Sequence, residues 1–227
     1  MKKYLALLFV LPLLLFSCEQ SEPYGNLVVI APVQAVFDDA ADSARFSLTV
    51  DKTNKQLWVS NASDYLSKGV KDENKYLASY QEYQHEYRDG YNSVIQLIDL
   101  LNITIGVQKV NPDSLPTLPN HKVLEITDVY LTQQHLNISF TFLHSAAAIH
   151  SFFICQDTSV KGSDITLYFR HKCDGIQGTE SYGGVIAVDL STVVYPKNTE
   201  TATLTVNAPL TSGTSHTTTV SYTLPTK

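Results

Sequence analysis

The feature that most limits the fold of this chain is its succession of short strand-forming runs. In these runs β-branched and aromatic residues alternate with polar ones, and Gly, Pro, Asn and Asp separate one run from the next. Segments with helical periodicity are scarce. The pattern therefore predicts an all-β protein.

A proline-rich segment divides the predicted strands into two groups. Pro112, Pro116 and Pro119 each lack the amide donor that a central strand needs. We therefore predict a linker at residues 112–120, with one domain at residues 26–111 and another at residues 121–227. Both are long enough to bury a core of their own.

The first domain is predicted to be a five-stranded barrel of the oligonucleotide/oligosaccharide-binding (OB) type. Residues 61–75 form its connector, with one helical turn. The run from Tyr76 to Tyr91 is ambiguous, because its tyrosines have helical spacing whereas Leu77, Tyr83 and Tyr87 would share one face of a strand. We interpret it as a strand. The predicted strands are residues 27–37, 44–50, 56–60, 76–87 and 94–110.

The second domain is predicted to be an immunoglobulin-like β-sandwich, because seven short half-buried strands follow the linker. In two of these runs alternate residues are large and apolar: Ile138, Phe140 and Phe142 share one face, as do residues 165, 167 and 169. The predicted strands are residues 122–131, 135–143, 149–156, 164–171, 185–190, 201–207 and 217–224.

The N-terminus predicts a lipoprotein signal peptide at residues 1–17. Lys2 and Lys3 precede an apolar run, and Leu15-Phe16-Ser17-Cys18 is similar to a bacterial lipobox. The apolar run is shorter than the roughly 20 residues of a membrane span. An ordinary secretory signal with a chance cysteine is the alternative.

Cleavage before Cys18 would leave a cysteine that carries several acyl chains, followed by a tether at residues 18–25. We therefore expect a cell-envelope protein anchored to the outer membrane through Cys18, facing the periplasm or the cell exterior. The net charge is −6 and becomes more negative when Lys2 and Lys3 leave with the leader. An acidic chain without clustered Lys and Arg argues against a nucleic-acid partner.

Cys155 and Cys173 are the other two cysteines. An oxidising compartment permits a disulfide between them, but their positions on consecutive predicted strands argue against direct cross-strand pairing. Two buried thiols are the favoured interpretation, and the disulfide remains open.

Four strings of residues carry a resemblance to a known family. The order of leader, barrel and sandwich resembles the NigD-like lipoproteins, which pair an N-terminal OB domain with a C-terminal β-sandwich. The chain departs from that pattern between Tyr76 and Asp99, which is richer in tyrosine. The resemblance implies bacteriocin-associated immunity or envelope protection and no catalytic residue. The strings are LWVSN (57–61), ITDVYLTQQHLNISFTF (126–142), ITLYFRHKCDG (165–175) and GGVIAVDLS (183–191).

Aromatic residues of the barrel are the first candidate site. Trp58 with Tyr80, Tyr83 and Tyr87 could form a platform on which the ring of a glycan stacks. Packing within the core and at strand edges is the alternative, because tyrosine is an ordinary strand residue.

The second candidate is Arg170, His171 and Asp174, which follow Tyr168-Phe169 near the end of a predicted strand. They could bind an anionic or sugar ligand through charge-assisted bonds. The alternative is that Arg170 and Asp174 pin the following loop.

No pattern in the chain indicates catalysis. The sequence has no HExxH metal motif and no Gly-x-Ser-x-Gly elbow, and the seven histidines are interpreted as surface or loop residues. We therefore expect no metal, no cofactor and no enzymatic activity, with a hydrolase as a distant alternative. The predicted function is binding of a protein toxin or, alternatively, of a glycan.

Overall fold

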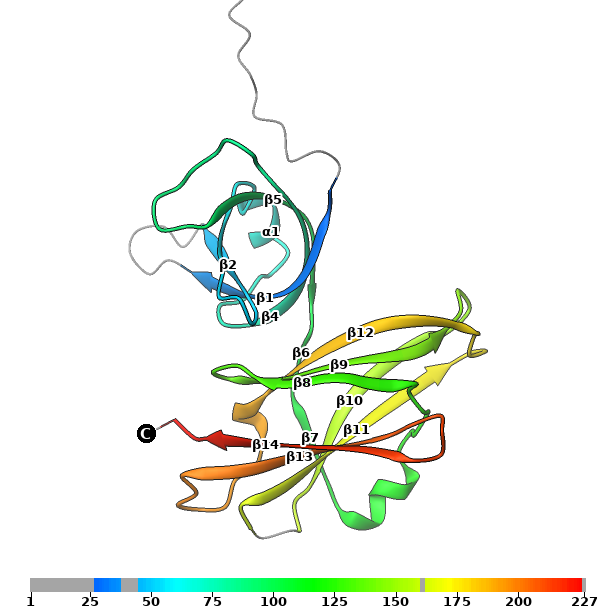
Figure 1. Cartoon of the computed structure of the whole chain (residues 1–227). Coiled ribbons are helices and arrows are strands. Elements are labelled where there is room, and N and C mark those ends of the chain that lie inside the picture. The colour runs from blue at the N-terminus through cyan, green and yellow to red at the C-terminus, as the bar shows by residue number, and fades with distance from the viewer. Residues whose placement is uncertain (1–26, 38–44, 160–161, 226–227) are drawn as a thin grey trace, which may run out of the picture.

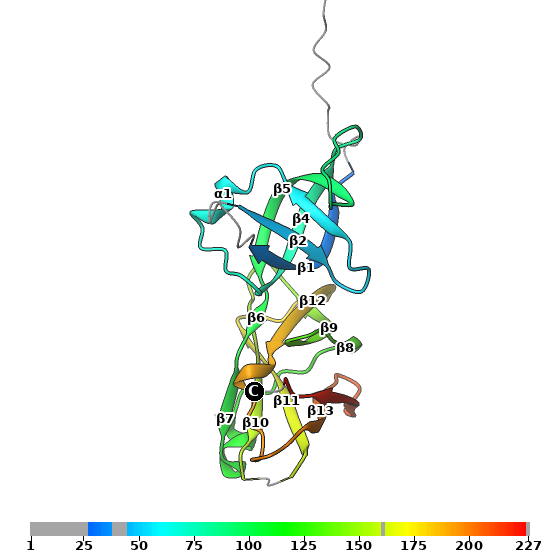
Figure 2. The same ribbon diagram turned by 90° about the vertical axis from the view of Figure 1, so that its left-hand side faces the viewer.

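The computed structural model describes residues 27–37, 45–159 and 162–225 (Figure 1). A closed five-stranded barrel lies at one end of the molecule and a two-sheet β-sandwich at the other (Figures 1 and 2). The predicted all-β fold class is confirmed. The finer, immunoglobulin-like arrangement of the sandwich stays a prediction.

The barrel closes because its first strand pairs with both β2 and β4. The order around the barrel is β1-β2-β3-β5-β4, and the short helix α1 (Ser63–Leu66) lies in the β3–β4 connector, where one helical turn was expected. The strands are β1 (Val29–Phe37), β2 (Phe46–Val50), β3 (Gln56–Val59), β4 (Lys75–Glu82) and β5 (Ser93–Asn102).

The barrel interior is filled by alternate residues of these strands, as a two-residue period requires. Leu48, Leu57 and Ile95 are fully buried there. α1 closes one end, since the hydroxyl of Tyr65 donates to the carbonyl of Ile98 at 2.5 Å.

The sandwich consists of a five-stranded sheet, β14-β13-β11-β10-β7, and a four-stranded sheet, β6-β12-β9-β8. Three of its pairings are parallel: β7 with β10, β11 with β13, and β6 with β12. The elements are β6 (Thr104–Ile105), β7 (Val107–Val110), the 3-10 helix η1 (Pro112–Thr117), β8 (Glu125–Leu131), β9 (His135–His144), β10 (Ile149–Asp157), β11 (Asp164–Asp174), β12 (Glu180–Asp189), the 3-10 helix η2 (Leu190–Thr192), β13 (Thr201–Pro209) and β14 (Ser215–Thr223).

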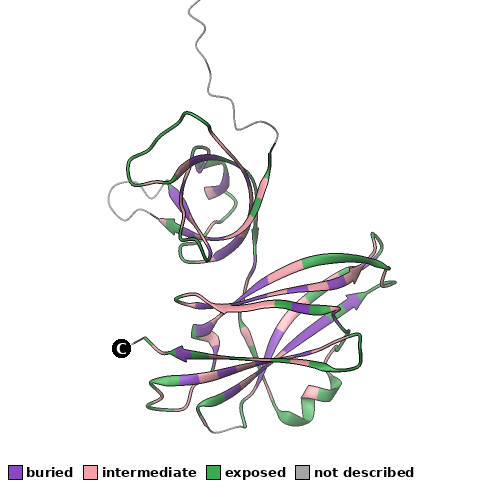
Figure 3. Cartoon of the chain, in the orientation of Figure 1, coloured by how far each residue is buried: buried purple, intermediate pink, exposed green. Residues whose placement is uncertain are grey.

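The sandwich core is centred on Phe140, whose ring centroid lies 4.5 Å from that of Phe152 and 5.0 Å from that of Phe169. The buried residues of the sandwich come from strands of both sheets, and Figure 3 colours them purple on the ribbon. Gly184 is opposite Phe140 in the β9–β12 register. A Cβ at position 184 would lie 2.6 Å from the Phe140 ring, so glycine makes room for that ring.

The division between the domains is a correction to the sequence analysis. The run 94–110 is three strands, and two of them, β6 and β7, pair with the sandwich. The proline-rich segment lies inside the sandwich, between β7 of one sheet and β8 of the other. The prediction failed because alternation shows that a residue run is extended, but does not show which sheet it joins.

A second correction concerns the run 76–87. β4 ends at Glu82, and the residues that follow belong to the β4–β5 loop. Tyr83 makes one more bond to the sheet, from its amide to the carbonyl of Val94 at 2.9 Å.

A buried ion pair fixes the barrel against the sandwich. Lys75 donates to Asp51, and the side chains of both are almost fully buried. The second oxygen of Asp51 accepts a bond at 3.0 Å from the hydroxyl of Tyr130 on β8. Next to this pair, Ile103 accepts a bond from the amide of Ala187 at 2.8 Å. The polar groups of Lys75, Asp51 and Tyr130 are therefore satisfied at the junction.

Cys155 and Cys173 are free and buried. In the β10–β11 register Cys155 is opposite Tyr168 and Cys173 is opposite His150, which keeps the two thiols apart. The interpretation as buried thiols is confirmed.

The signal peptide, Cys18 and the tether lie outside the described residues. Within the described part of the chain, none of the helices has the length and apolar character needed to cross a bilayer.

Candidate functional site

The candidate site is a cluster on the barrel that we call the Trp58 surface, formed by Trp58, Tyr91, Arg45 and Arg88. The guanidinium carbons of Arg45 and Arg88 lie 5.6 and 5.3 Å from the centre of the Trp58 ring. The Tyr91 ring meets Trp58 edge-on at 5.1 Å. Both arginines are within the range in which a cation is attracted to an indole face.

Strand alternation directs Trp58 outward. Its neighbours on β3, Leu57 and Val59, point into the barrel core, so the residue between them lies on the other face. Arg45 lies directly before β2, the strand that pairs with β3. The surface therefore combines one strand residue with the segment leading into β2.

The β4–β5 loop supplies Arg88 and Tyr91 and is tied to β3. The side chain of Asn92 accepts a bond from the Gln56 amide at 2.7 Å, and the Asn92 amide donates to the Gln56 carbonyl at 2.8 Å. The loop turns at Gly90, whose φ of +83° suits glycine. These bonds hold Tyr91 beside Trp58.

Of the predicted aromatic residues, Trp58 belongs to this surface and Tyr80 does not. Tyr80 is 2% exposed and packs in the barrel core, where burial and nearby Glu82 raise its pKa to about 12. Tyr83 is half-buried, and Tyr87 is 79% exposed on the β4–β5 loop. The assignment of Tyr80 to a surface platform is therefore wrong.

The structure does not bring the second predicted group together. Arg170 and His171 are consecutive on β11 and point to opposite faces. The Arg170 guanidinium lies 5.3 Å from the centre of the Tyr168 ring, and Asp174 accepts a bond from Lys172 at 2.6 Å. Asp174 is therefore paired with Lys172, and the structure gives no contact between Arg170 and Asp174 among the described residues.

His171 instead joins a histidine cluster that the sequence did not reveal. Nδ1 of His150 and Nε2 of His171 are 2.8 Å apart, and the rings of His121 and His144 lie against this pair. His171 is fully buried, and burial with the neighbouring His150 lowers its pKa to about 4. The interpretation of all seven histidines as surface or loop residues is therefore wrong. The described residues form no group of three or more His, Cys, Asp or Glu that could hold a metal ion.

The sandwich carries the sequence signal of a known family. The family described as the NigD-like C-terminal beta sandwich domain matches residues 108–222, which is more than half of the chain. The chain belongs to the NigD-like family. The matched range begins within β7, in agreement with the pairing of that strand to the sandwich. No curated protein matches the sequence.

Solved structures resemble the NigD-like chain over both domains. A NigD-like immunity protein from Bacteroides caccae is 15% identical, covers 89% of this chain and 99% of its own, and has a TM-score of 0.58. A protein from Bacteroides fragilis named as a candidate lipoprotein is 12% identical, with coverage of 88% and 99% and a TM-score of 0.61. A protein from Parabacteroides distasonis named as a candidate toxin-related protein is 21% identical, with coverage of 87% and 94% and a TM-score of 0.59. At these identities the likeness concerns the fold alone.

Proposed function

We propose that this NigD-like chain is a lipid-anchored envelope protein that captures a ligand on the Trp58 surface and acts by binding rather than by catalysis. The observation that carries the proposal is the convergence of two guanidinium groups and a tyrosine edge on one tryptophan ring. In OB barrels, ligands bind on the face of strands 2 and 3 and on the loops that join strands 1 to 2 and 4 to 5. Trp58, Arg45, Arg88 and Tyr91 come from these places.

A glycan is the ligand class that this chemistry favours. Aromatic rings accept the flat apolar face of a sugar, and guanidinium groups donate hydrogen bonds to its hydroxyl or carboxylate oxygens. The arginines rest against the indole, which restricts their motion and lowers the entropy lost on binding. Tyr87 is exposed on the loop that also supplies Arg88 and Tyr91.

Capture of a protein toxin is the second candidate. It is favoured by the fold shared with the Bacteroides caccae protein named as a NigD-like immunity protein. A toxin gene beside the gene of this chain would support it. The same surface would serve, because Trp, Tyr and Arg are the residues that most often dominate protein interfaces.

Binding to an immobilised panel of oligosaccharides tests the first candidate. We expect Trp58→Ala to weaken binding of a captured oligosaccharide by up to about two decades, because aromatic contacts to a stacked ring contribute roughly 1–3 kcal/mol. Tyr87→Ala should have a smaller effect. Tyr182→Ala is the matched control, since Tyr182 is an exposed aromatic residue of the sandwich that contacts His144.

The outcomes separate the candidates. Loss of oligosaccharide binding in Trp58→Ala but not in Tyr182→Ala supports the glycan. If no oligosaccharide binds and the wild type captures the product of a neighbouring toxin gene through Trp58, the toxin is the ligand. If the ligand maps to Arg170 or Asp174 and Trp58→Ala has no effect, the barrel is not the binding domain.

Anchoring is tested separately. The apolar leader that ends at Cys18 supports lipidation, and the fold shared with the Bacteroides fragilis protein named as a candidate lipoprotein supports an envelope location. Cells grown with a labelled fatty acid should label the wild type and leave Cys18→Ala unlabelled. Equal labelling of the two would refute the anchor.

A further inference from the structure

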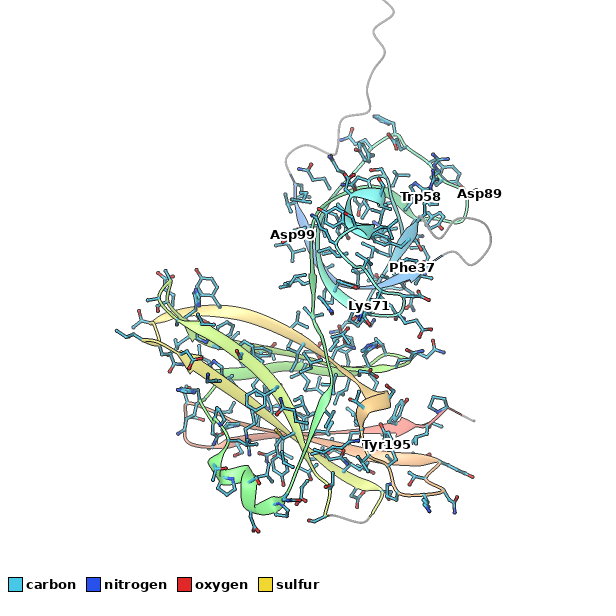
Figure 4. All side chains as sticks on the ribbon, turned by 180° about the vertical axis from the view of Figure 1, so that it is seen from behind. Phe37, Trp58, Lys71, Asp89, Asp99 and Tyr195 are labelled. Atoms are coloured by element: carbon cyan, nitrogen blue, oxygen red, sulfur yellow. The ribbon has the colours of Figure 1, made fainter. Side chains whose placement is uncertain are left out.

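A cleft of about 1240 Å³ opens where the barrel approaches one end of the sandwich. We call it the interdomain cleft. The barrel contributes residues 72–74, from the connector before β4. The sandwich contributes the turn before β9, the end of β12 with η2, the segment leading to β13, and the end of β14. The Trp58 surface is elsewhere: Figure 4 shows Trp58 on the barrel, well separated from Tyr195 of the cleft.

The cleft has an acidic lining. Its lining includes four acidic residues and one lysine, Lys197, and both domains supply acidic groups. The acidic residues are Asp72 and Glu73 from the barrel, and Asp189 and Glu200 from the sandwich.

His135 gives the cleft a buried polar group without a partner. It lines the cleft and is 3% exposed, and its Nδ1 makes no hydrogen bond within the described residues. Burial and the nearby Lys75 ammonium lower its pKa, which favours the neutral ring. A neutral imidazole can accept a hydrogen bond through one ring nitrogen. Most buried polar atoms in proteins have a hydrogen-bond partner, so this nitrogen is available to a donor from a ligand.

Asp189 is a carboxylate whose charge acts on three other side chains that line the cleft. Burial raises the pKa of the hydroxyls of Tyr195 and Tyr222, and the charge of Asp189 adds a smaller increase to both. The same charge opposes the lowering of the His135 pKa. Oδ1 of Asp189 accepts bonds from the amide and hydroxyl of Ser191, at 2.9 and 2.7 Å. These bonds fix the carboxylate at the end of β12.

We propose that the interdomain cleft binds a basic segment of a polypeptide, with a lysine or arginine side chain directed to Asp189 and His135. Ammonium and guanidinium groups donate charge-assisted hydrogen bonds to carboxylates and can donate to a neutral imidazole. The cleft exceeds the roughly 300–1,000 Å³ typical of small-molecule pockets, which favours a peptide over a small amine. Glu73 lies on the barrel side, so the bound segment contacts both domains.

The test uses a fluorescent peptide of alternating lysine and serine, and the same peptide with every lysine acetylated. We expect the purified protein to bind the first peptide and not the second, with affinity that falls as salt is added. Asp189→Asn should weaken binding about tenfold, because one charge-assisted contact is lost. Glu73→Gln should weaken it less.

Asp157→Asn is the matched control. Oδ1 of Asp157 accepts bonds from the amide and hydroxyl of Ser159, at 2.8 and 2.7 Å, in the same kind of turn as Asp189 and Ser191. The Asp157→Asn substitution removes one negative charge at a position outside the cleft. Asparagine can form the same kind of turn, so the turn is kept in both variants. Thermal unfolding of both variants confirms that the fold is retained.

Three results would overturn the proposal. The first is equal binding of the lysine peptide and its acetylated form. The second is the same loss of affinity in Asp189→Asn and Asp157→Asn. The third is binding of spermidine as tightly as the peptide, which would make the cleft a site for small amines. Trp58→Ala should leave peptide binding unchanged, so failure of the barrel site and failure of this one are distinguishable.

Discussion

The barrel and the sandwich bury polar groups in different ways. At the edge of the barrel, Lys75 and Asp51 neutralise each other, and Tyr130 satisfies the remaining carboxylate oxygen. In the sandwich, Nδ1 of His135 has no partner among the described residues, and the buried His171 ring meets the ring of His150 rather than a carboxylate. A paired charge is costly to disrupt, whereas a buried neutral imidazole responds to protons. We therefore expect the barrel to be sensitive to loss of charge and the sandwich to pH.

The largest expected effect concerns whether the two regions are separate folding units. A fragment that begins at Thr104 keeps β6 and β7, whereas one that begins at Asn120 lacks both. We expect the longer fragment to unfold cooperatively and the shorter one to show no cooperative transition, because β10 and β12 lose their neighbours. Thermal unfolding followed by circular dichroism measures this. Equal transitions in both fragments would show that β6 and β7 are dispensable.

Removing one member of the buried ion pair should cost about 3–5 kcal/mol, because an unpaired ammonium remains in the interior. Asp51→Ala leaves Lys75 in that position. Urea unfolding should report the loss. Tyr130→Phe removes one hydrogen bond and should cost less, about 1.5–3 kcal/mol. If Asp51→Ala lowers the free energy of unfolding by less than Tyr130→Phe does, solvent reaches Lys75 once Asp51 is truncated.

The pH response of the sandwich should depend on His171. Its pKa is about 4 in the folded chain and about 6.5 when unfolded, so the unfolded state binds more protons between these values. The free energy of unfolding should therefore fall as the pH drops from about 6.5 towards 4, by up to about 3 kcal/mol. His171→Gln should flatten this part of the profile, and His85→Gln, an exposed residue of the barrel loop, should not. Matching profiles for wild type and His171→Gln would contradict the assignment.

The smallest expected effect tests how tightly the sandwich core is packed. Gly184→Ala places a methyl group against the Phe140 ring and should cost about 1–3 kcal/mol. Gly183→Ala is the control on the same strand, where a Cβ meets no atom within 4 Å. The difference in urea midpoint between Gly184→Ala and Gly183→Ala measures the cost of the methyl group against the Phe140 ring. No difference would show that Phe140 moves aside freely.

The sequence predicted the strands well, because alternation records which residues face a core. Ile138, Phe140 and Phe142 share the buried face of β9 as expected. The prediction failed near Ile103, where a continuous extended run passes from the barrel to the sandwich. Extended geometry alone contains no information about strand partners, so the predicted domain boundary lies too far towards the C-terminus.

The candidate site was predicted only in part, for a related reason. Trp58 was identified from its residue type, and Tyr91 belongs to the tyrosine series. Tyr80 was included although alternation places it on the face opposite Tyr83, and the structure buries it. Arg45 and Arg88 gave no signal, because only the closed barrel brings the start of β2 and the β4–β5 loop to the same tryptophan.

Closure of the barrel also limits how another protein can attach to it. Each described barrel strand has a neighbour on both sides, so these strands present no free sheet edge to an incoming strand. The sandwich ends in β14 and β7 on one sheet and in β8 and β6 on the other. Among the described strands, those of the sandwich therefore offer edges for strand addition, whereas the barrel strands offer their side chains.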